Sequence, residues 1–271
     1  MQTSFPASEE NFPIVLQKMI DYVQPYMSAI GLVKPGDDRK PPGDHCGTGS
    51  FITFNNQRYI LTCDHVATRK KLGTLGFTQF DAEEGLSIAN SFDCMPYPVD
   101  AAASPLSENS WHLISHRAKC IDRKMLSQSH RPVEGEYLFI YGFAAIDTKT
   151  AFGEHIIPGT GAFVHEVPYD PALDSENPKV IDGFHICMAF NPMNADQLEG
   201  RPAPLPLAEG MSGSLVWNTR YQELTMQEKH WSAEDSRITA ILWASSTKTC
   251  SLAATPIEHL EPLFKKLERV C

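Results

Sequence analysis

The chain has 271 residues, of which 42% are hydrophobic, 10% aromatic and 21% charged. This composition excludes a disordered chain, and at about 100–200 residues per domain the length predicts one large domain or two small ones. Lysine and arginine number 23 against 33 aspartates and glutamates, so the net charge of −10 gives no electrostatic reason to bind nucleic acid or an anionic membrane.

Residues 1–25 are predicted to be an N-terminal helical arm. Apolar residues recur at helical spacing within residues 9–24, and Pro25 ends the pattern. They are Leu16, Met19, Ile20 and Val23. We expect this amphipathic helix to pack on the body of the protein, with a partner-binding role as the alternative. The first residues, MQTSFPASEENF, have no basic n-region and no apolar h-region, so no signal peptide is expected.

From Tyr26 onward the chain consists of short apolar runs separated by turn residues. Residues 49–54 and 58–63 flank the turn NNQ and predict a β-hairpin. Other strands are expected at residues 26–34, 75–80, 85–89, 136–143, 162–167, 180–190, 214–218 and 238–244. Many short strands with turns between them favour an all-β barrel or sandwich. The longest apolar stretch, residues 137–146, is too short to cross a bilayer.

The last part of the chain is expected to contain a loop and then a helix. Residues 191–209 are rich in proline and lack periodicity, which predicts an ordered loop. Residues 256–271 predict an amphipathic C-terminal helix that begins at Pro256. Its apolar face holds Ile257, Leu260, Leu263, Phe264, Leu267 and Val270.

The seven cysteines favour neither a disulfide framework nor a metal site. Their number is odd and no CxxC pair occurs, so reduced thiols in a cytoplasmic protein are the simplest account. Two histidines and two cysteines near the first hairpin could form a zinc site, but their spacing matches no common zinc pattern. These residues are His45, Cys46, Cys63 and His65.

Three segments carry residues that suit nucleophilic acyl transfer. The predicted hairpin delivers His65 at its end, small apolar residues follow Asp100, and glycines flank Ser212 before a strand. A serine hydroxyl needs a nearby base, histidine can accept and return that proton, and an aspartate fixes the histidine tautomer. Asp81 and Asp93 are the alternatives to Asp100, but small apolar residues do not follow them.

These segments, in the order histidine, aspartate, serine, resemble the chymotrypsin-like (trypsin-like) serine peptidases. TCDHVA, VDAAASPL and GMSGSLV stand where that family has its histidine, aspartate and nucleophile motifs. GEYLFIYGFA, ITAILWASS and AATPIEHL extend the resemblance to about residues 26–271, and the style is nearest to the HtrA-type bacterial branch. The resemblance implies an all-β fold of two six-stranded β-barrels, residues 26–130 and residues 131–271, the latter with the C-terminal helix.

The same resemblance implies a serine endopeptidase that hydrolyses peptide bonds of a protein or peptide substrate. Ser212 is then the nucleophile, His65 the base and later the acid, and Asp100 the residue that orients His65. The backbone N–H groups of Gly210 and Ser212 form the oxyanion hole, and no metal or cofactor is implied. The substrate pocket is expected at Pro206, Trp243, Ala244 and Ser245. Because Pro206 is not acidic, a preference for arginine or lysine before the cleaved bond is not expected.

A second hypothesis assigns a function of a different class, peptide binding. A protein of this fold could bind peptides and be catalytically silent, or become active only with a regulatory protein partner. The long segment before Ser212, residues 144–209, is expected to carry extra loops that could hold an inactive oxyanion hole. The complete set of His65, Asp100 and Ser212 favours the enzyme.

Overall fold

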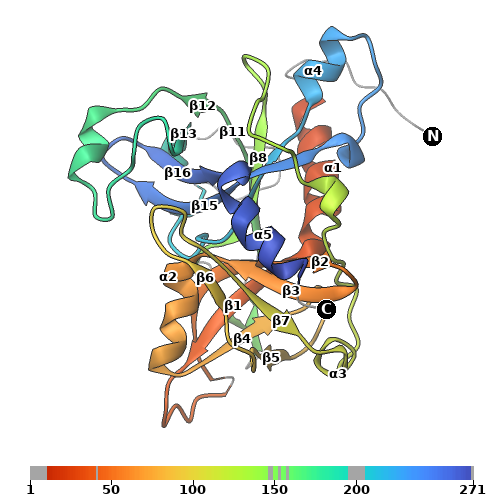
Figure 1. Ribbon diagram of the computed structural model, residues 1–271, viewed down its shortest axis with the longest axis vertical. Helices are drawn as coiled ribbons and strands as arrows, with labels where there is room; N and C mark the ends of the chain where they lie inside the picture. Colours follow the sequence, from red (N-terminus) through yellow and green to blue (C-terminus); the bar gives the residue numbers. More distant parts are fainter. Residues whose placement is uncertain are drawn as a thin grey trace.

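A computed structural model describes residues 11–40, 42–145, 149–151, 154–156, 159–194 and 205–269. In these residues the chain forms two large antiparallel sheets, which lie one above the other in Figure 1. The first sheet has seven strands in the order β5-β4-β1-β2-β3-β7-β6. These strands are β1 (Met27–Val33), β2 (Asp44–Phe54), β3 (Gln57–Thr62), β4 (Thr74–Thr78), β5 (Gly85–Ser87), β6 (Asp93–Met95) and β7 (Ala101–Leu106).

The second sheet also has seven strands, in the order β11-β8-β14-β15-β16-β13-β12. These strands are β8 (Leu138–Phe143), β11 (Gly159–Val164), β12 (Glu166–Val167), β13 (Ile186–Ala189), β14 (Leu215–Asn218), β15 (Arg237–Ser246) and β16 (Ser251–Pro256). Strands β9 (Lys149–Ala151) and β10 (Glu154–Ile156) form a separate two-stranded sheet.

The helices are short and lie around the sheets. They are α1 (Phe12–Val23), α2 (Asp64–Ala67), α3 (Glu108–Trp111), α4 (Tyr221–Met226) and α5 (Glu261–Leu267). Single 3₁₀ turns are η2 (Gln24–Tyr26), η3 (Thr68–Leu72), η4 (Arg123–Met125), η6 (Pro171–Ser175), η7 (Pro192–Asn194), η8 (Ala233–Asp235) and η9 (Ile257–Leu260). None of the helices in the described ranges combines the length and the apolar character that a membrane crossing requires.

The predicted hairpin shows how the sequence determines local structure. Strands β2 and β3 pair antiparallel, with Phe51 opposite Ile60 and Phe54 opposite Gln57. The two turn residues, Asn55 and Asn56, have φ values of 46° and 64°. A two-residue hairpin turn of this kind requires positive φ at both positions, and asparagine tolerates it better than most residues do.

The N-terminal helix packs on the second sheet. Helix α1 buries five apolar side chains, including Met19, which is fully buried, and the Met19 sulfur accepts a hydrogen bond from the Ser236 hydroxyl at 3.3 Å. The Phe12 ring meets the Tyr137 ring at 4.7 Å, beside β8. Helix α1 therefore packs on the body of the protein and is part of its core.

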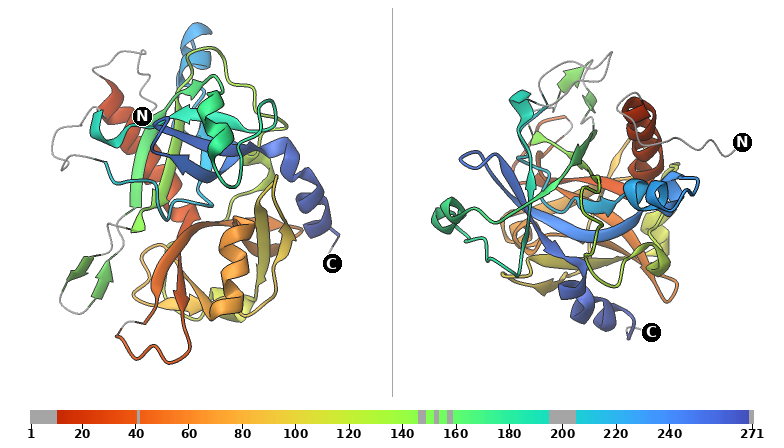
Figure 2. Two further views of the ribbon diagram at one scale, coloured as in Figure 1. Left: turned by 90° about the vertical axis from the view of Figure 1, so that its left-hand side faces the viewer. Right: turned by 90° about the horizontal axis from the view of Figure 1, so that it is seen from above.

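The C-terminal helix packs on the first sheet instead. The Phe264 ring of α5 lies 5.3 Å from the ring of Phe54, and the Tyr59 hydroxyl donates to the Leu267 carbonyl at 3.2 Å. The Lys266 ammonium forms an ion pair with Asp93 at 2.5 Å. Each sheet thus receives the terminal helix that is distant from it in sequence, and the two helices lie on different sides of the molecule (Figure 2).

The all-β architecture is confirmed, and several details differ from the expectation. Each large sheet has seven strands in the described residues, where six were expected. Strands β6 and β7 were not predicted, because Ala101–Ala103 have low intrinsic strand propensity and form a strand through burial against β3. The C-terminal segment is a 3₁₀ turn followed by α5 rather than one helix from Pro256. Within the loop expected at residues 191–209, residues 195–204 lie outside the described ranges.

Candidate active site

His65 and Asp100 are joined by two hydrogen bonds. His65 lies on α2, directly after β3, and Asp100 directly precedes β7, which pairs with β3. The Asp100 carboxylate accepts the backbone N–H of His65 at 2.9 Å and binds the ring Nδ1 at 2.6 Å. The aspartate is 4% exposed. Because an ionised carboxylate only accepts hydrogen bonds, it places the ring proton on Nδ1 and leaves Nε2 able to accept a proton.

The loop that carries Ser212 is attached to both sheets. The Thr48 N–H of β2 donates to the Ser212 carbonyl at 2.8 Å, and the Gly213 N–H donates to the Leu242 carbonyl of β15 at 2.8 Å. Gly213 has a φ of 96°, and a Cβ there would lie 2.0 Å from the Thr48 oxygen. Only glycine fits this position, so the sharp turn after Ser212 depends on it.

The segments that carry His65 and Ser212 are both hydrogen-bonded to strand β15, at neighbouring residues. The Cys63 thiol donates to the Leu242 carbonyl at 3.2 Å, and the Ser212 hydroxyl donates to the next carbonyl, that of Trp243, at 3.2 Å. Within the described part of the chain, no hydrogen bond joins the His65 ring to the Ser212 hydroxyl. The hydroxyl must therefore turn from Trp243 before the imidazole can accept its proton.

The peptide group between Glu209 and Gly210 is held in one orientation. The Ala145 N–H donates to the Glu209 carbonyl at 2.7 Å. Because a trans peptide is planar, the Gly210 N–H points the opposite way. Among the residues that the structure describes, the N–H groups of Gly210 and Ser212 have no hydrogen-bond partner. Two such free donors beside a nucleophile can stabilise a negatively charged oxygen.

His45 and Thr48 support the same loop from the first sheet. The His45 Nε2 lies 2.7 Å from the Phe143 carbonyl and 3.1 Å from the Gly210 carbonyl, and the Thr48 hydroxyl donates to the Gly210 carbonyl at 3.0 Å. Both partners of Nε2 are acceptors, so this nitrogen carries the proton. Burial is the main cause that lowers the pKa of His45, against the two carbonyl bonds that raise it. The residue is therefore held as a neutral donor.

Sequence reasoning did not assign these supporting roles. His45 was considered only as a zinc ligand, and Thr48 was not singled out. Their partners lie about a hundred residues or more away in sequence, so no local pattern connects them. The one local signal is their place beside Gly47 and Gly49 in the hairpin strand that precedes His65.

A cleft of about 420 Å³ opens beside Ser212. This volume is within the range of about 300–1,000 Å³ that is usual for ligand sites. Its wall includes three of the four residues expected in the substrate pocket, whereas Pro206 and His65 are not part of it. The lining residues are His45, Cys46, Arg69, Ala145, Ala208, Glu209, Gly210, Ser212, Leu242, Trp243, Ala244 and Ser245.

The side chains near His65 offer a poor set of metal ligands. Donor atoms of Cys63, His65 and Asp100 lie within 4.8 Å of one another. However, the Cys63 thiol is fully buried, already donates to the Leu242 carbonyl, and has a pKa that burial raises well above its ordinary value. A metal binds the thiolate, so this environment disfavours a metal here. His45 is likewise occupied by two carbonyls, and we assign no metal or cofactor to the site.

A comparison with protein-family models and with curated protein sequences gives no match. Among solved structures, the chain is similar to the active form of the Rv3671c protease from M. tuberculosis, with a TM-score of 0.52 and 13% identity over 97% of this chain and 87% of that one. It is also similar to an inactivated protease paralogue of the scabies mite, with a TM-score of 0.50 and 13% identity over 90% of this chain and 95% of that one.

These matches decide the fold. The chain has the chymotrypsin-like fold. At 13% identity the likeness extends to the fold alone, and it singles out no HtrA-type branch. In this chymotrypsin-like fold, the Ser212 motif lies where the two sheets meet, since Ser212 is hydrogen-bonded to β2 of the first sheet and to β15 of the second.

Proposed function

We propose that this protein is a serine endopeptidase with Ser212, His65 and Asp100 as its catalytic residues. The observation that carries the proposal is the Asp100 carboxylate, which binds both the ring and the backbone of His65. This double contact fixes the imidazole tautomer that a general base requires. The bonds of Cys63 and Ser212 to adjacent residues of β15 support the placement of the nucleophile near that base.

The proposed reaction follows from these roles. The Ser212 Oγ forms a bond to the scissile carbonyl carbon while its proton passes to the His65 Nε2. The carbonyl oxygen becomes negative and accepts hydrogen bonds from the Gly210 and Ser212 N–H groups. The C–N bond then breaks, and the same proton goes to the departing amine. Water, deprotonated by His65, next attacks the acyl-enzyme, and Ser212 regains a proton as the acid product leaves.

The substrate is proposed to be an extended peptide that pairs with β15. Strand β14 pairs with β15 up to Ile241, and Gly213 and Ser214 bond to Leu242 on the same edge. Along residues 243–246, β15 is therefore covered only on its other edge, by β16. A strand edge that is open on one side can accept an extended peptide through main-chain hydrogen bonds. The cleft wall contributed by Ala208, Leu242 and Ala244 suits an apolar side chain before the cleaved bond.

One observation favours a second candidate, a peptide-binding protein that is silent or becomes active only with a regulatory partner. The Ser212 hydroxyl donates to the Trp243 carbonyl rather than to His65. An activating partner would then act by releasing this bond.

A fluorophosphonate probe, which reacts covalently with activated serine nucleophiles, separates the two functions. We expect labelling of the wild-type protein that disappears in Ser212→Ala and persists in Ser214→Ala. Ser214 is the matched control, because its hydroxyl is buried and without a partner in the described residues. Labelling that survives in Ser212→Ala would refute the assigned nucleophile. No labelling with or without peptide and cell extract would refute the enzyme.

The cysteines support a reducing location, and we propose the cytoplasm. Cys46, Cys63, Cys94, Cys120, Cys187 and Cys250 are all free thiols. Extracellular proteins with this many cysteines usually contain disulfides. Fractionation of cells that express a tagged chain tests this location, and recovery of the protein outside the cytoplasm would contradict it.

A further inference from the structure

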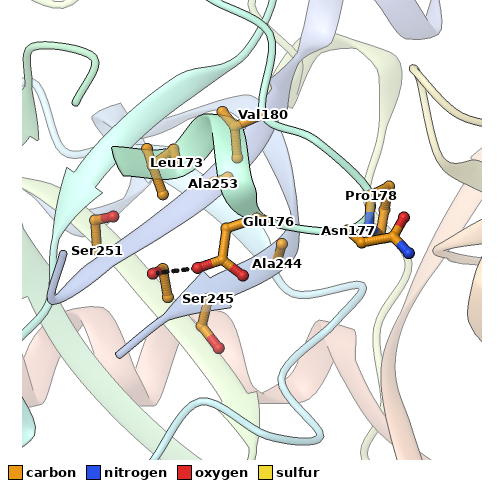
Figure 3. Close-up of a pocket in the computed structure, with 10 residues that line it drawn as sticks. Leu173, Glu176, Asn177, Pro178, Val180, Ala244, Ser245, Ser251 and Ala253 are labelled. Carbon is orange, nitrogen blue, oxygen red and sulfur yellow. Dashed lines mark hydrogen bonds between the residues drawn. The ribbon is translucent and has the colours of Figure 1, made fainter. Parts of the chain in front are cut away.

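A second recess adjoins the 420 Å³ cleft along strand β15, since Ala244 and Ser245 line both. It has a volume of about 80 Å³ and lies between β15, β16 and the segment that follows η6 (Figure 3). Its lining residues are Leu173, Glu176, Asn177, Pro178, Val180, Ala244, Ser245, Ser246, Ser251 and Ala253. Glu176 is the one ionisable side chain among them. This volume suits the end of one side chain rather than a whole small-molecule ligand.

The Glu176 carboxylate is positioned by a neutral partner. The Ser246 hydroxyl donates to Glu176 Oε1 at 2.8 Å, the dashed bond in Figure 3. Among the residues that the structure describes, Glu176 forms no ion pair. The two nearby lysines are bonded elsewhere, since Lys179 pairs with Asp174 at 2.7 Å and Lys248 donates to the Ser175 hydroxyl at 3.2 Å. The recess therefore presents an ordered negative charge that no described cation neutralises.

The recess and the cleft share a wall, which links the carboxylate to the proposed peptide path. Ala244 and Ser245 line both. Successive residues of a strand point to opposite faces, so Ala244 and Ser246 share one face of β15. A peptide that pairs antiparallel with this edge places its side chains on the same face as the residues opposite them.

The position of the peptide residue beside Glu176 follows from this pairing. The Ser212 hydroxyl contacts the Trp243 carbonyl, so the residue that is attacked lies opposite Trp243. In antiparallel pairing, the residues before it lie opposite Ala244, Ser245 and Ser246 in turn. The fourth residue on the N-terminal side of the cleaved bond is then opposite Ser246 and beside Glu176.

We propose that Glu176 and Ser246 form a specificity subsite for a basic side chain at this fourth position. The inference rests on the proposed function, because it takes the peptide to lie along β15. A lysine ammonium or arginine guanidinium in the recess would form a charge-assisted hydrogen bond with the carboxylate. The substrates would then combine an apolar residue at the cleaved bond with a basic residue three positions before it.

The test measures binding rather than turnover, so that a failure of catalysis does not obscure it. Ser212→Ala protein is titrated with fluorescent extended peptides that differ only by lysine, norleucine or glutamate at one scanned position. We expect lysine at the fourth position to bind about fivefold more tightly than norleucine, with glutamate weakest. This difference should shrink at high salt, because screening weakens an exposed ion pair.

Three variants in the Ser212→Ala background complete the experiment. Adding Glu176→Gln should abolish the preference for lysine, adding Glu176→Lys should reverse it, and adding Asp182→Asn should leave it unchanged. Asp182 is the matched control, an exposed carboxylate of the same segment that does not line the recess. Peptides that bind without a lysine preference, a preference that persists in the Glu176→Gln variant, or no peptide binding at all would each overturn the subsite. Binding with this preference but without cleavage by the wild type would uphold the subsite and refute the proposed function.

Discussion

Asp100 combines burial with an unusual backbone conformation. Its φ is 52°, in the left-handed region that residues other than glycine and asparagine adopt infrequently. Such strain persists where surrounding contacts enforce it, and it often occurs at functional sites. Here the two bonds from His65 are the contacts that hold the carboxylate.

At the residue scale, Asp100→Asn tests the orienting role. An asparagine of the same shape would favour the wrong imidazole tautomer, so we expect kcat/KM for peptide hydrolysis to fall by about 10³–10⁴-fold. Asp93→Asn is the control, because Asp93 binds Lys266 at the protein surface. Steady-state kinetics of both variants checks the assignment. Intact turnover in Asp100→Asn together with lost turnover in Asp93→Asn would reverse it.

Two exposed thiols should differ in reactivity. Cys94 and Cys250 are both exposed residues, but partial desolvation of the Cys94 thiol, with smaller contributions from Asp64 and Asp93, raises the pKa of Cys94 to about 12. Because the thiolate is the reactive form, we expect iodoacetamide to alkylate Cys94 at least ~10-fold more slowly than Cys250 near neutral pH. Mass spectrometry of the native protein over time measures both rates. Equal rates would show that the environment of Cys94 does not hold its proton.

The candidate site residues show which parts of such a site can be proposed from sequence. His65, Asp100 and Ser212 each stand next to a turn and a strand, so short motifs identified them. Glu176 and Ser246 could not be found in this way, because 70 positions separate them and neither lies in a motif. Contacts between distant segments depend on the sheet arrangement, which periodicity does not determine.

At the element scale, substitutions in helix α1 test how tightly it packs on the second sheet. Met19→Ala would remove a fully buried side chain from the contact with the second sheet, and we expect the free energy of unfolding to fall by about 2–5 kcal/mol. Ile14→Ala on the same helix is the control, because Ile14 is 43% exposed and should change stability by about 0.5 kcal/mol or less. Urea unfolding measures both. Equally small changes would favour the alternative, a helix reserved for a partner.

Strands were easier to predict where side chains are branched or aromatic than where they are small. The hairpin of β2 and β3 is rich in such residues and was predicted with its turn. Strand β7 begins with three alanines that are all fully buried, so its structure comes from its neighbours rather than from propensity. Strand β7 was therefore not predicted from its own residues.

At the scale of the whole molecule, two histidines join the halves. His45 of the first sheet binds the Phe143 and Gly210 carbonyls, and the His185 Nε2 donates to the Pro98 carbonyl at 2.8 Å, two residues before Asp100. The His185 Nδ1 accepts the Ile181 N–H at 2.9 Å. Burial is the main cause that lowers the pKa of both histidines.

These lowered pKa values predict a loss of stability in mild acid. Below the ordinary histidine pKa of about 6.5 the unfolded chain binds protons that the folded chain does not, so stability falls as pH falls. Each histidine should contribute up to about 1.4 kcal/mol per pH unit. We therefore expect Tm to drop between about pH 7 and about pH 5, and to drop less steeply in His45→Gln/His185→Gln. His230→Gln, at an exposed site, is the control; an unchanged slope in the double variant would contradict the assignment.

Each terminal helix packs on the sheet that is distant from it in sequence, so the two halves of the chain should stay together when the chain is cut once in its middle. A cut between the first and second sheets would leave an N-terminal fragment that begins with α1, bound to the second sheet, and a C-terminal fragment that ends with α5, bound to the first. Each fragment would hold the other by a buried helix, so the nicked protein should stay together without a covalent link. Two separately produced fragments should likewise reassemble, because neither has a complete core without its counterpart.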